Sequence, residues 1–206
     1  VEGLANALVA SGAILHYLGE TQHHKLQHIT SIERLLEADF VWMDKFTIRN
    51  LELYHSNNHS AVTLIDVIDK TLSPMGGRLL KRWLALPLKS VEAIKSRHDV
   101  VGYFYENEAV LLDLQSHLKG MGDLERLISK VATAKVNPRE VVQLKNTLEQ
   151  LLPIKELALA SSQTALNNIG VEIVDCEALR SKIKATLNEN APVNILKGNT
   201  IASSAN

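Results

Sequence analysis

Several features are scarce in this sequence, and each scarcity excludes a class of protein. The 206 residues include one cysteine, Cys176, so no disulfide can form within the chain and a reducing compartment is expected. Aromatic residues make up only 4% of the chain, although 46% of its residues are hydrophobic. Leucine, alanine and isoleucine must therefore fill the core, which is typical of a helical domain of this length.

No charge of one sign is in excess either. The chain has 22 lysines and arginines against 23 aspartates and glutamates, which gives a formal net charge of −1. Surfaces that bind nucleic acids strongly usually show a basic excess, so the composition argues against such a surface. The apolar residues 1–18 are interrupted by polar side chains and lack a basic start, which predicts neither a membrane span nor a signal peptide. We therefore expect a cytoplasmic protein with no membrane partner.

Helical patterns occupy most of the chain. Leucines at positions 4, 8, 15 and 18 fall on one helical face and predict a helix that ends near Gly19. A second apolar stripe over residues 61–72 predicts another helix. Four further helix starts are marked by capping residues. These are Ser73 before Pro74, Ser90, Asp123, and Asn137 before Pro138 with Glu140 three residues later. Pro87 and Pro153 are expected to end the helices that begin at residues 74 and 138.

Two segments are predicted to be extended. Residues 40–53 partly alternate between apolar and polar side chains, which favours a short strand. Residues 193–202 place Gly198-Asn199 between two short apolar runs, which favours a small hairpin. The predicted fold class is therefore mostly α, an irregular multi-helix bundle with a few short β-strands at about residues 40–53 and 193–202. Because the chain stops directly after the predicted hairpin, we expect a piece of a longer polypeptide.

The eight histidines raise the question of a metal site. Two pairs, His24 with His28 and His55 with His59, have the i, i+4 spacing that puts two imidazoles on one helical face. A zinc site needs a third ligand, and the sequence contains neither H-E-x-x-H nor a paired-cysteine motif. Solvated histidines are the favoured interpretation. A metal-dependent hydrolase that uses one of these pairs stays as a weaker alternative.

Nucleophilic catalysis and phosphate binding find little support. No G-x-S-x-G motif occurs, and Cys176 falls on the predicted buried stripe of a helix, where a thiol behaves as a small hydrophobic group. Gly76-Gly77 followed by Lys81 lacks the spacing of a P-loop. These glycines more simply permit close packing of a helix. No catalytic residue, cofactor site or metal site is predicted.

A basic group on one helix is the best candidate for contact with nucleic acid. Arg78, Lys81 and Arg82 lie on one side of the helix that begins at residue 74, and Leu79 and Trp83 are expected to point inward on the other. Three cations could bind a phosphate backbone. No ladder of aromatic residues accompanies them, so an ion pair within the chain is the favoured role. Asp123 and Glu125 are the proposed partners.

Several of these segments together resemble one known family. The motifs are D-x-x-T-x-R-N-L-E-L at residues 44–53, S-P-M-G-G-R-L-L-K-R-W-L-A-L-P-L at 73–88, G-D-L-E-R at 122–126 and P-R-E at 138–140. They are similar to the core, or lever, domain of the MutS family of DNA mismatch-repair ATPases. By this resemblance residues 1–30 form the junction with the connector domain. Residues 31–206 form the core domain, truncated before the clamp insertion and the returning lever helices.

The resemblance implies a mechanical role. In that family the core couples the ATPase to the domains that read mismatches and clamp DNA. This chain would thus have no activity or cofactor of its own, while its bacterial, cytoplasmic parent would bind ATP and Mg. The implied partners are other domains of the parent, a second parent subunit, mismatched double-stranded DNA and a MutL-type protein. The residues expected at structural positions are Arg49, Asn50, Arg78, Trp83, Pro87, Asp123 and Arg126.

Residues 104–106 read F-Y-E and match the F-x-E pattern with which the family stacks on a mismatched base. That reader lies in a different domain, so the role is not transferred to Phe104. The alternative of another class is a free-standing helical adaptor, which would bind a partner helix in an apolar groove.

Overall fold

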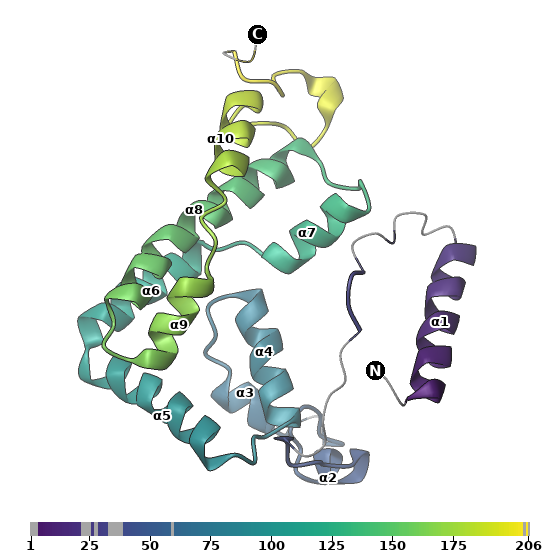
Figure 1. Cartoon of the computed structure of the whole chain (residues 1–206), viewed down its shortest axis with the longest axis vertical. Helices are drawn as coiled ribbons and strands as arrows, with labels where there is room; N and C mark the ends of the chain where they lie inside the picture. The colour runs from purple at the N-terminus through teal and green to yellow at the C-terminus, as the bar shows by residue number, and fades with distance from the viewer. Residues whose placement is uncertain are drawn as a thin grey trace.

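The computed structural model describes residues 4–21, 26, 29–32, 39–58, 60–203 and 205. Within them the regular secondary structure is helical, which confirms the predicted mostly α, multi-helix fold class (Figure 1). The elements are α1 (Ala5–Glu20), α2 (Lys45–Asn50), α3 (Leu64–Ile68), α4 (Pro74–Ala85), α5 (Val91–Glu106), α6 (Glu108–Gly120), α7 (Leu124–Ala132), α8 (Pro138–Ala160), α9 (Thr164–Glu172), α10 (Glu177–Thr186) and the 3-10 helix η2 (Ile195–Lys197).

The longest helix, α8, is the element around which the others pack. It contacts α6, α7, α9 and α10 along its length. Its start is fixed locally by a capping box, as predicted: the Asn137 side chain accepts from the Glu140 N–H at 3.0 Å, and the Glu140 side chain accepts from the Asn137 N–H at 3.1 Å. Leu144 and Leu148 of α8 pack with Leu127 of α7 to form the buried core cluster.

The prediction that Pro153 ends this helix is wrong. The helix continues through Pro153 to Ala160. An interior proline removes one backbone hydrogen bond and costs about 3 kcal/mol, so tertiary contacts must stabilise the second half. The packing of α9 on α8 supplies them, since Gly170 of α9 and Ala158 of α8 are both buried. In addition, the Lys155 Nζ donates to the Ile173 carbonyl at 2.8 Å.

The predicted strand over residues 40–53 is also wrong in most of its length. Lys45–Asn50 form α2, because the Asp44 carboxylate accepts from the Thr47 N–H at 2.7 Å and caps the helix. The extended part is confined to one antiparallel bridge between Phe40 and Leu88. The capping carboxylate outweighs the partial alternation that suggested a strand.

The predicted hairpin at residues 193–202 does not form. Ile195–Lys197 are the 3-10 helix η2, and the Asn194 side chain accepts from the Leu196 N–H at 3.0 Å at its start. Ile201 instead pairs with Leu187, just after α10. In the described residues the β-pairing therefore consists of this bridge and the Phe40–Leu88 bridge.

Two further expectations need adjustment. The helix expected over residues 61–72 is limited to α3, because the backbone of Asp69 is extended. The Asp69 carboxylate then accepts a hydrogen bond from the Thr71 N–H at 3.0 Å and forms a turn. Cys176 lies before α10 rather than within it. It has a left-handed backbone (φ 53°), is half-buried, and packs against the core cluster.

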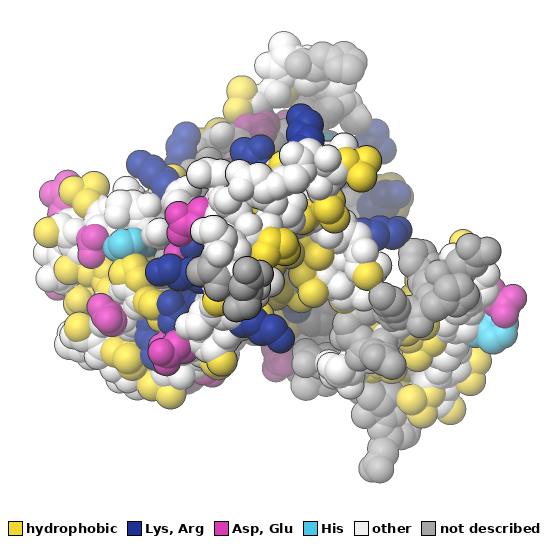
Figure 2. Space-filling view, turned by 90° about the horizontal axis from the view of Figure 1, so that it is seen from above, with side chains coloured by type: hydrophobic (Ala, Val, Ile, Leu, Met, Phe, Trp, Pro, Cys, Tyr) yellow, Lys and Arg dark blue, Asp and Glu magenta, His cyan; other side chains and the backbone are white. Residues whose placement is uncertain are grey.

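Helix α1 lies to one side of the bundle (Figure 1) and matches the predicted helix that ends near Gly19. None of its residues is buried, and Val9, Ile14 and Tyr17 are each more than 60% exposed. Figure 2 shows hydrophobic side chains on the surface at this side of the molecule. No helix in the described part of the chain has the length and apolar character needed to cross a membrane.

The packing of α9 on α8 gives a stability prediction. A Cβ added at Gly170 would lie 3.0 Å from the Ala158 Cβ and the Leu159 backbone nitrogen. We expect Gly170→Ala to lower the free energy of unfolding by about 1–3 kcal/mol, because the backbone cannot move aside cheaply. The matched control is Gly102→Ala in α5, where nothing lies within 4 Å of the added Cβ. It should raise stability by about 0.5–1 kcal/mol. Urea unfolding of both variants measures the difference, and equal effects would contradict the packing argument.

Candidate functional site

The candidate site is the junction between α4 and α7, because it joins parts of the chain that are far apart in sequence. Helix α4 begins as predicted: the Ser73 hydroxyl accepts from the Gly76 N–H at 3.1 Å, Pro74 is the first helical residue, and the helix ends before Pro87. This start directs Arg78 towards the beginning of α7.

Arg78 forms a forked ion pair with two acidic residues of α7 and its cap. Its guanidinium donates to both carboxylate oxygens of Asp123, at 2.9 and 2.7 Å. It also donates to Glu125 through Nε at 2.8 Å and through a terminal nitrogen at 2.5 Å. The partners that the sequence suggested for Arg78 are therefore confirmed. Two-point pairing of this kind fixes orientation as well as distance.

Asp123 has a second role at the same place. Its carboxylate accepts from the Arg126 N–H at 3.2 Å and caps α7, as predicted for a helix start. Hydrogen bonds from Arg78 lower the pKa of Asp123, with a further contribution from the Arg126 N–H. The hydrogen bonds to Asp123 and Glu125 raise the pKa of Arg78. The Arg78 side chain is 47% exposed and that of Glu125 67%. Such solvated pairs contribute more to geometry than to stability.

The residue before Asp123 ties the junction to α8. The Gly122 N–H donates to the Thr147 hydroxyl at 3.1 Å, and this hydroxyl donates to the Gln143 carbonyl at 2.9 Å. Thr147 is only 1% exposed. A Cβ at position 122 would lie 2.9 Å from the Thr147 hydroxyl oxygen, so only glycine fits. The Arg78–Asp123 and Gly122–Thr147 hydrogen bonds, linked by the peptide bond between Gly122 and Asp123, therefore connect α4 to α8.

Trp83 does not have its predicted place in the core. It is 42% exposed, and Leu79 on the same helix is 46% exposed. The Trp83 ring instead faces Arg97 of α5, whose guanidinium carbon lies 3.6 Å from the ring centroid. Burial of this guanidinium lowers the pKa of Arg97. The stacked pair is a second contact between α4 and the helices that follow it.

The other predicted residues of this region, Arg49, Asn50 and Pro87, lie in the segment before α4 or directly after that helix. Arg49 donates to the Asn57 side chain at 2.8 Å, and the Pro87 carbonyl accepts from the Val41 N–H at 2.7 Å. Asn50 is the exposed last residue of α2. The carbonyl of Lys81 accepts from the Tyr54 hydroxyl at 2.6 Å, which joins the same segment to α4.

Lys81 and Arg82, the cations next to Arg78, are exposed. Their contact with a phosphate backbone stays a prediction. Arg126 is exposed too and borders a small cavity with Asp123 and Glu140.

Sequence reasoning missed the roles of Gly122, Thr147 and Arg97. The G-D-L-E-R motif pointed to the first of these, but its Thr147 partner lies 25 residues away.

The remaining candidates are the paired histidines and Phe104. His24, His28 and His59 lie outside the described residues, and His55 is exposed. Among the described residues no group of three histidine, cysteine, aspartate or glutamate side chains could hold a metal ion. Phe104 is half-buried near the end of α5 and packs edge-on against Tyr103, with ring centroids 5.5 Å apart.

The double role of Asp123 gives a pH prediction. Because its pKa is lowered in the folded state, its ionised form stabilises the fold above about pH 3.9, its unfolded pKa, and this contribution is lost as the pH falls through the folded pKa. Asp123→Asn keeps a capping oxygen but loses the charge. We expect it to be less stable than the wild type at pH 7 and to approach it near pH 2.5, in urea unfolding.

Asp123→Ala is the control for the cap. It removes the carboxylate and the capping oxygen together, so it should be less stable than Asp123→Asn by about 1 kcal/mol at both pH values. If the free energies of unfolding of the wild type and Asp123→Asn differ by the same amount at pH 7 and pH 2.5, the ion pair does not contribute to stability as expected.

Comparison with known proteins gives a consistent result. A family model described as MutS domain III matches residues 46–204. The chain is 61% identical, over 98% of its length, to the DNA mismatch repair protein MutS of Flavobacterium psychrophilum, and 60% identical over its whole length to that of Flavobacterium johnsoniae. The MutS protein of Bacteroides thetaiotaomicron is 47% identical over the whole chain. The chain spans about a quarter of the length of these relatives, 23% to 24%.

Proposed function

Because the chain belongs to the MutS domain III family, we propose that it is the non-catalytic lever segment of a bacterial, cytoplasmic DNA mismatch-repair protein. It passes rearrangements between an ATPase elsewhere in the parent polypeptide and the parts that read mismatches and clamp DNA. Residues 31–206 are assigned to the core domain, and residues 1–30 to its junction with the connector. ATP and Mg, mismatched DNA, a second subunit and a MutL-type partner would be bound through the parent.

The main support for a coupling role is the way α4 is attached. The tightly packed helix pairs among the described residues all come from α5 to α10. Helix α4 lies outside that packed group and is joined to it by the Arg78 fork and the Trp83–Arg97 stack. A rigid group of helices connected to a second unit by a few directional contacts can have discrete arrangements, which coupling requires.

The fork is suited to such a junction. Two-point pairing to Asp123 and Glu125 defines one orientation of α4, and the three side chains are close enough to solvent to be rehydrated when they separate. Breaking the ion pair therefore costs little free energy, and forming it selects one orientation of α4. The hydrogen bond from the Gly122 N–H to the Thr147 hydroxyl carries a displacement of the start of α7 directly to α8.

The parent protein allows a direct test with Arg78→Met. We expect it to bind mismatched DNA without ATP, and to hydrolyse ATP, within about twofold of the wild type. Its ATP-induced change on DNA, followed by fluorescence energy transfer in stopped flow, should be slower by about 2- to 30-fold, the usual range for a coupling residue.

Arg82→Met is the matched control, because it removes a neighbouring cation that has no part in the fork. The rate of its ATP-induced change on DNA should match that of the wild type. Arg78→Lys keeps the charge but not the two-point geometry, so it should resemble Arg78→Met. A normal ATP-induced rate in Arg78→Met would contradict the coupling role, as would equal slowing in Arg82→Met.

A further inference from the structure

Lys145 of α8 is the one charged side chain among the buried residues in the described part of the chain, and it is 5% exposed. It takes no part in the Arg78 junction. Its Nζ lies 3.7 Å from the carboxylate of Glu149, one turn further along α8, and 3.6 Å from that of Glu189, which follows α10. A buried ammonium needs an anion beside it, and this one has two, on different elements.

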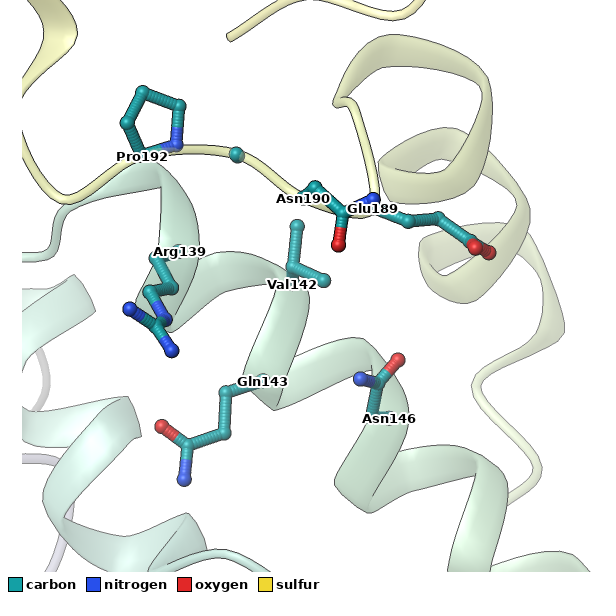
Figure 3. Close-up of a pocket in the computed structure, with 8 residues that line it drawn as sticks. Arg139, Val142, Gln143, Asn146, Glu189, Asn190 and Pro192 are labelled. Atoms are coloured by element: carbon teal, nitrogen blue, oxygen red, sulfur yellow. The ribbon is translucent and has the colours of Figure 1, made fainter.

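Glu189 belongs to a short segment, residues 188–192, that we call the strap. Figure 3 shows it passing over α8. The hydrogen bonds of the strap are internal or go to residues 199 and 200. The Ala191 N–H donates to the Asn188 carbonyl at 2.9 Å, and the Asn188 N–H donates to the Thr200 carbonyl at 2.9 Å. Within the residues that the structure describes, no hydrogen bond joins the strap to α8.

The attachment of the strap to α8 is therefore slight. It consists of the Lys145–Glu189 ion pair and the burial of Ala191, which is 3% exposed. The Glu189 side chain is 72% exposed, and an ion pair that is solvated on one side contributes little to stability. A methyl group also buries little apolar surface.

The seated strap is also incompletely packed. A hollow of about 640 Å³ remains between it and the first turns of α8. The hydroxyl oxygen of Thr200, whose carbonyl holds the start of the strap, is buried and has no hydrogen-bond partner among the described residues. A gap loses van der Waals contacts, and an unmade hydrogen bond destabilises the arrangement that buries it. Both features lower the free-energy cost of lifting the strap.

We propose that the strap is a releasable element and that Lys145 exchanges partners when it lifts. In the seated state the ammonium lies between the carboxylates of Glu149 and Glu189. In the lifted state Glu189 leaves with the strap, and Glu149 stays on α8 as the remaining partner. A buried charge that loses its only partner is strongly destabilising. Glu149 therefore makes release of the strap feasible.

The surrounding backbone suits such a movement. The antiparallel bridge between Leu187 and Ile201 holds together the two ends of the loop that contains the strap. The loop can therefore move about that bridge while α10 stays in place. An element with two discrete positions is what coupling between distant sites requires. The proposal itself rests on the contacts of Lys145 and the strap, and not on the coupling role.

The test is the reactivity of a cysteine in the strap, Ala191→Cys, in the full-length parent. N-ethylmaleimide reacts with a buried thiol only after local opening, so the labelling rate follows the population of the lifted state. Mass spectrometry of the labelled peptides separates this position from other cysteines. Leu196→Cys, at a position that is 93% exposed, gives the rate of an open thiol. We expect Ala191→Cys to react about 10- to 1,000-fold more slowly, as for a minor open state.

The two carboxylates should have opposite effects on this rate. Glu189→Gln weakens the seated state and should raise the rate about 2- to 5-fold, the range for a solvated ion pair. Glu149→Gln should lower the rate by a similar factor, because it destabilises the lifted state more than the seated state, where Glu189 still pairs. Glu156→Gln removes an exposed carboxylate further along α8 and should leave the rate unchanged.

Lys145→Met removes the charge and keeps an apolar side chain. In this background neither glutamate substitution should change the labelling rate of Ala191→Cys. Equal rates for Ala191→Cys and Leu196→Cys would overturn the proposal, as would no labelling of Ala191→Cys. A rise with both glutamate substitutions would overturn it too, because the carboxylates would then only hold the fold together. Parallel changes in the labelling of Cys176, which packs against the core cluster, would show general loosening and have the same consequence.

Discussion

The forked ion pair of Arg78 with Asp123 and Glu125 is the interaction on which the arrangement of this chain depends. Helices α5 to α10 pack around α8, with a buried leucine cluster between α7 and α8 and an ion pair of Lys130 with Glu140. Helix α4 and the segment before it join that group through polar contacts. Because Asp123 both pairs with Arg78 and caps α7, the position of α4 and the start of α7 are set by one carboxylate.

The contacts around the fork explain why certain residue types are needed. Gly122 must lack a side chain so that its N–H can reach the buried Thr147 hydroxyl. Arg78 must be arginine rather than lysine, because only a guanidinium can donate to two carboxylates in fixed directions. Arg97 covers the Trp83 ring, so an exposed tryptophan loses part of its contact with water. The coupling role proposed for the chain needs such directional contacts at the edge of a rigid packed body.

Much of the fold could be predicted because it is encoded locally. The caps at Ser73, Asp123 and Asn137 depend on residues within three positions of the helix start, and all three are present. The errors have two sources. Pro153 lies inside α8 because the packing of α9 outweighs the local cost of proline, and no local pattern contains that packing. The strands expected near Asp44 and Asn194 are helical turns because these side chains cap them.

The site itself was only partly predictable, for the same reason. Charge and motif suggested the acidic partners of Arg78, although Asp123 and Glu125 lie 45 and 47 residues further along the sequence. The Trp83–Arg97 stack could not be predicted. The apolar stripe of the helix indicated that Trp83 is buried, but it cannot show which side chain covers the indole ring. The sequence could not predict the surface pocket between the first turns of α8 and residues 189–192, because its two walls come from segments far apart in the chain.

The most direct test of the central claim is the distance between α4 and α8 in the chain itself. Spin labels at Arg82→Cys and Glu156→Cys, in a Cys176→Ala background, allow that distance to be measured by pulsed electron resonance. With Arg78 present, we expect one narrow distance distribution. With Arg78→Met we expect a broader or shifted distribution, while the helix content by circular dichroism stays unchanged. An identical narrow distribution in both proteins would contradict the claim that the fork positions α4.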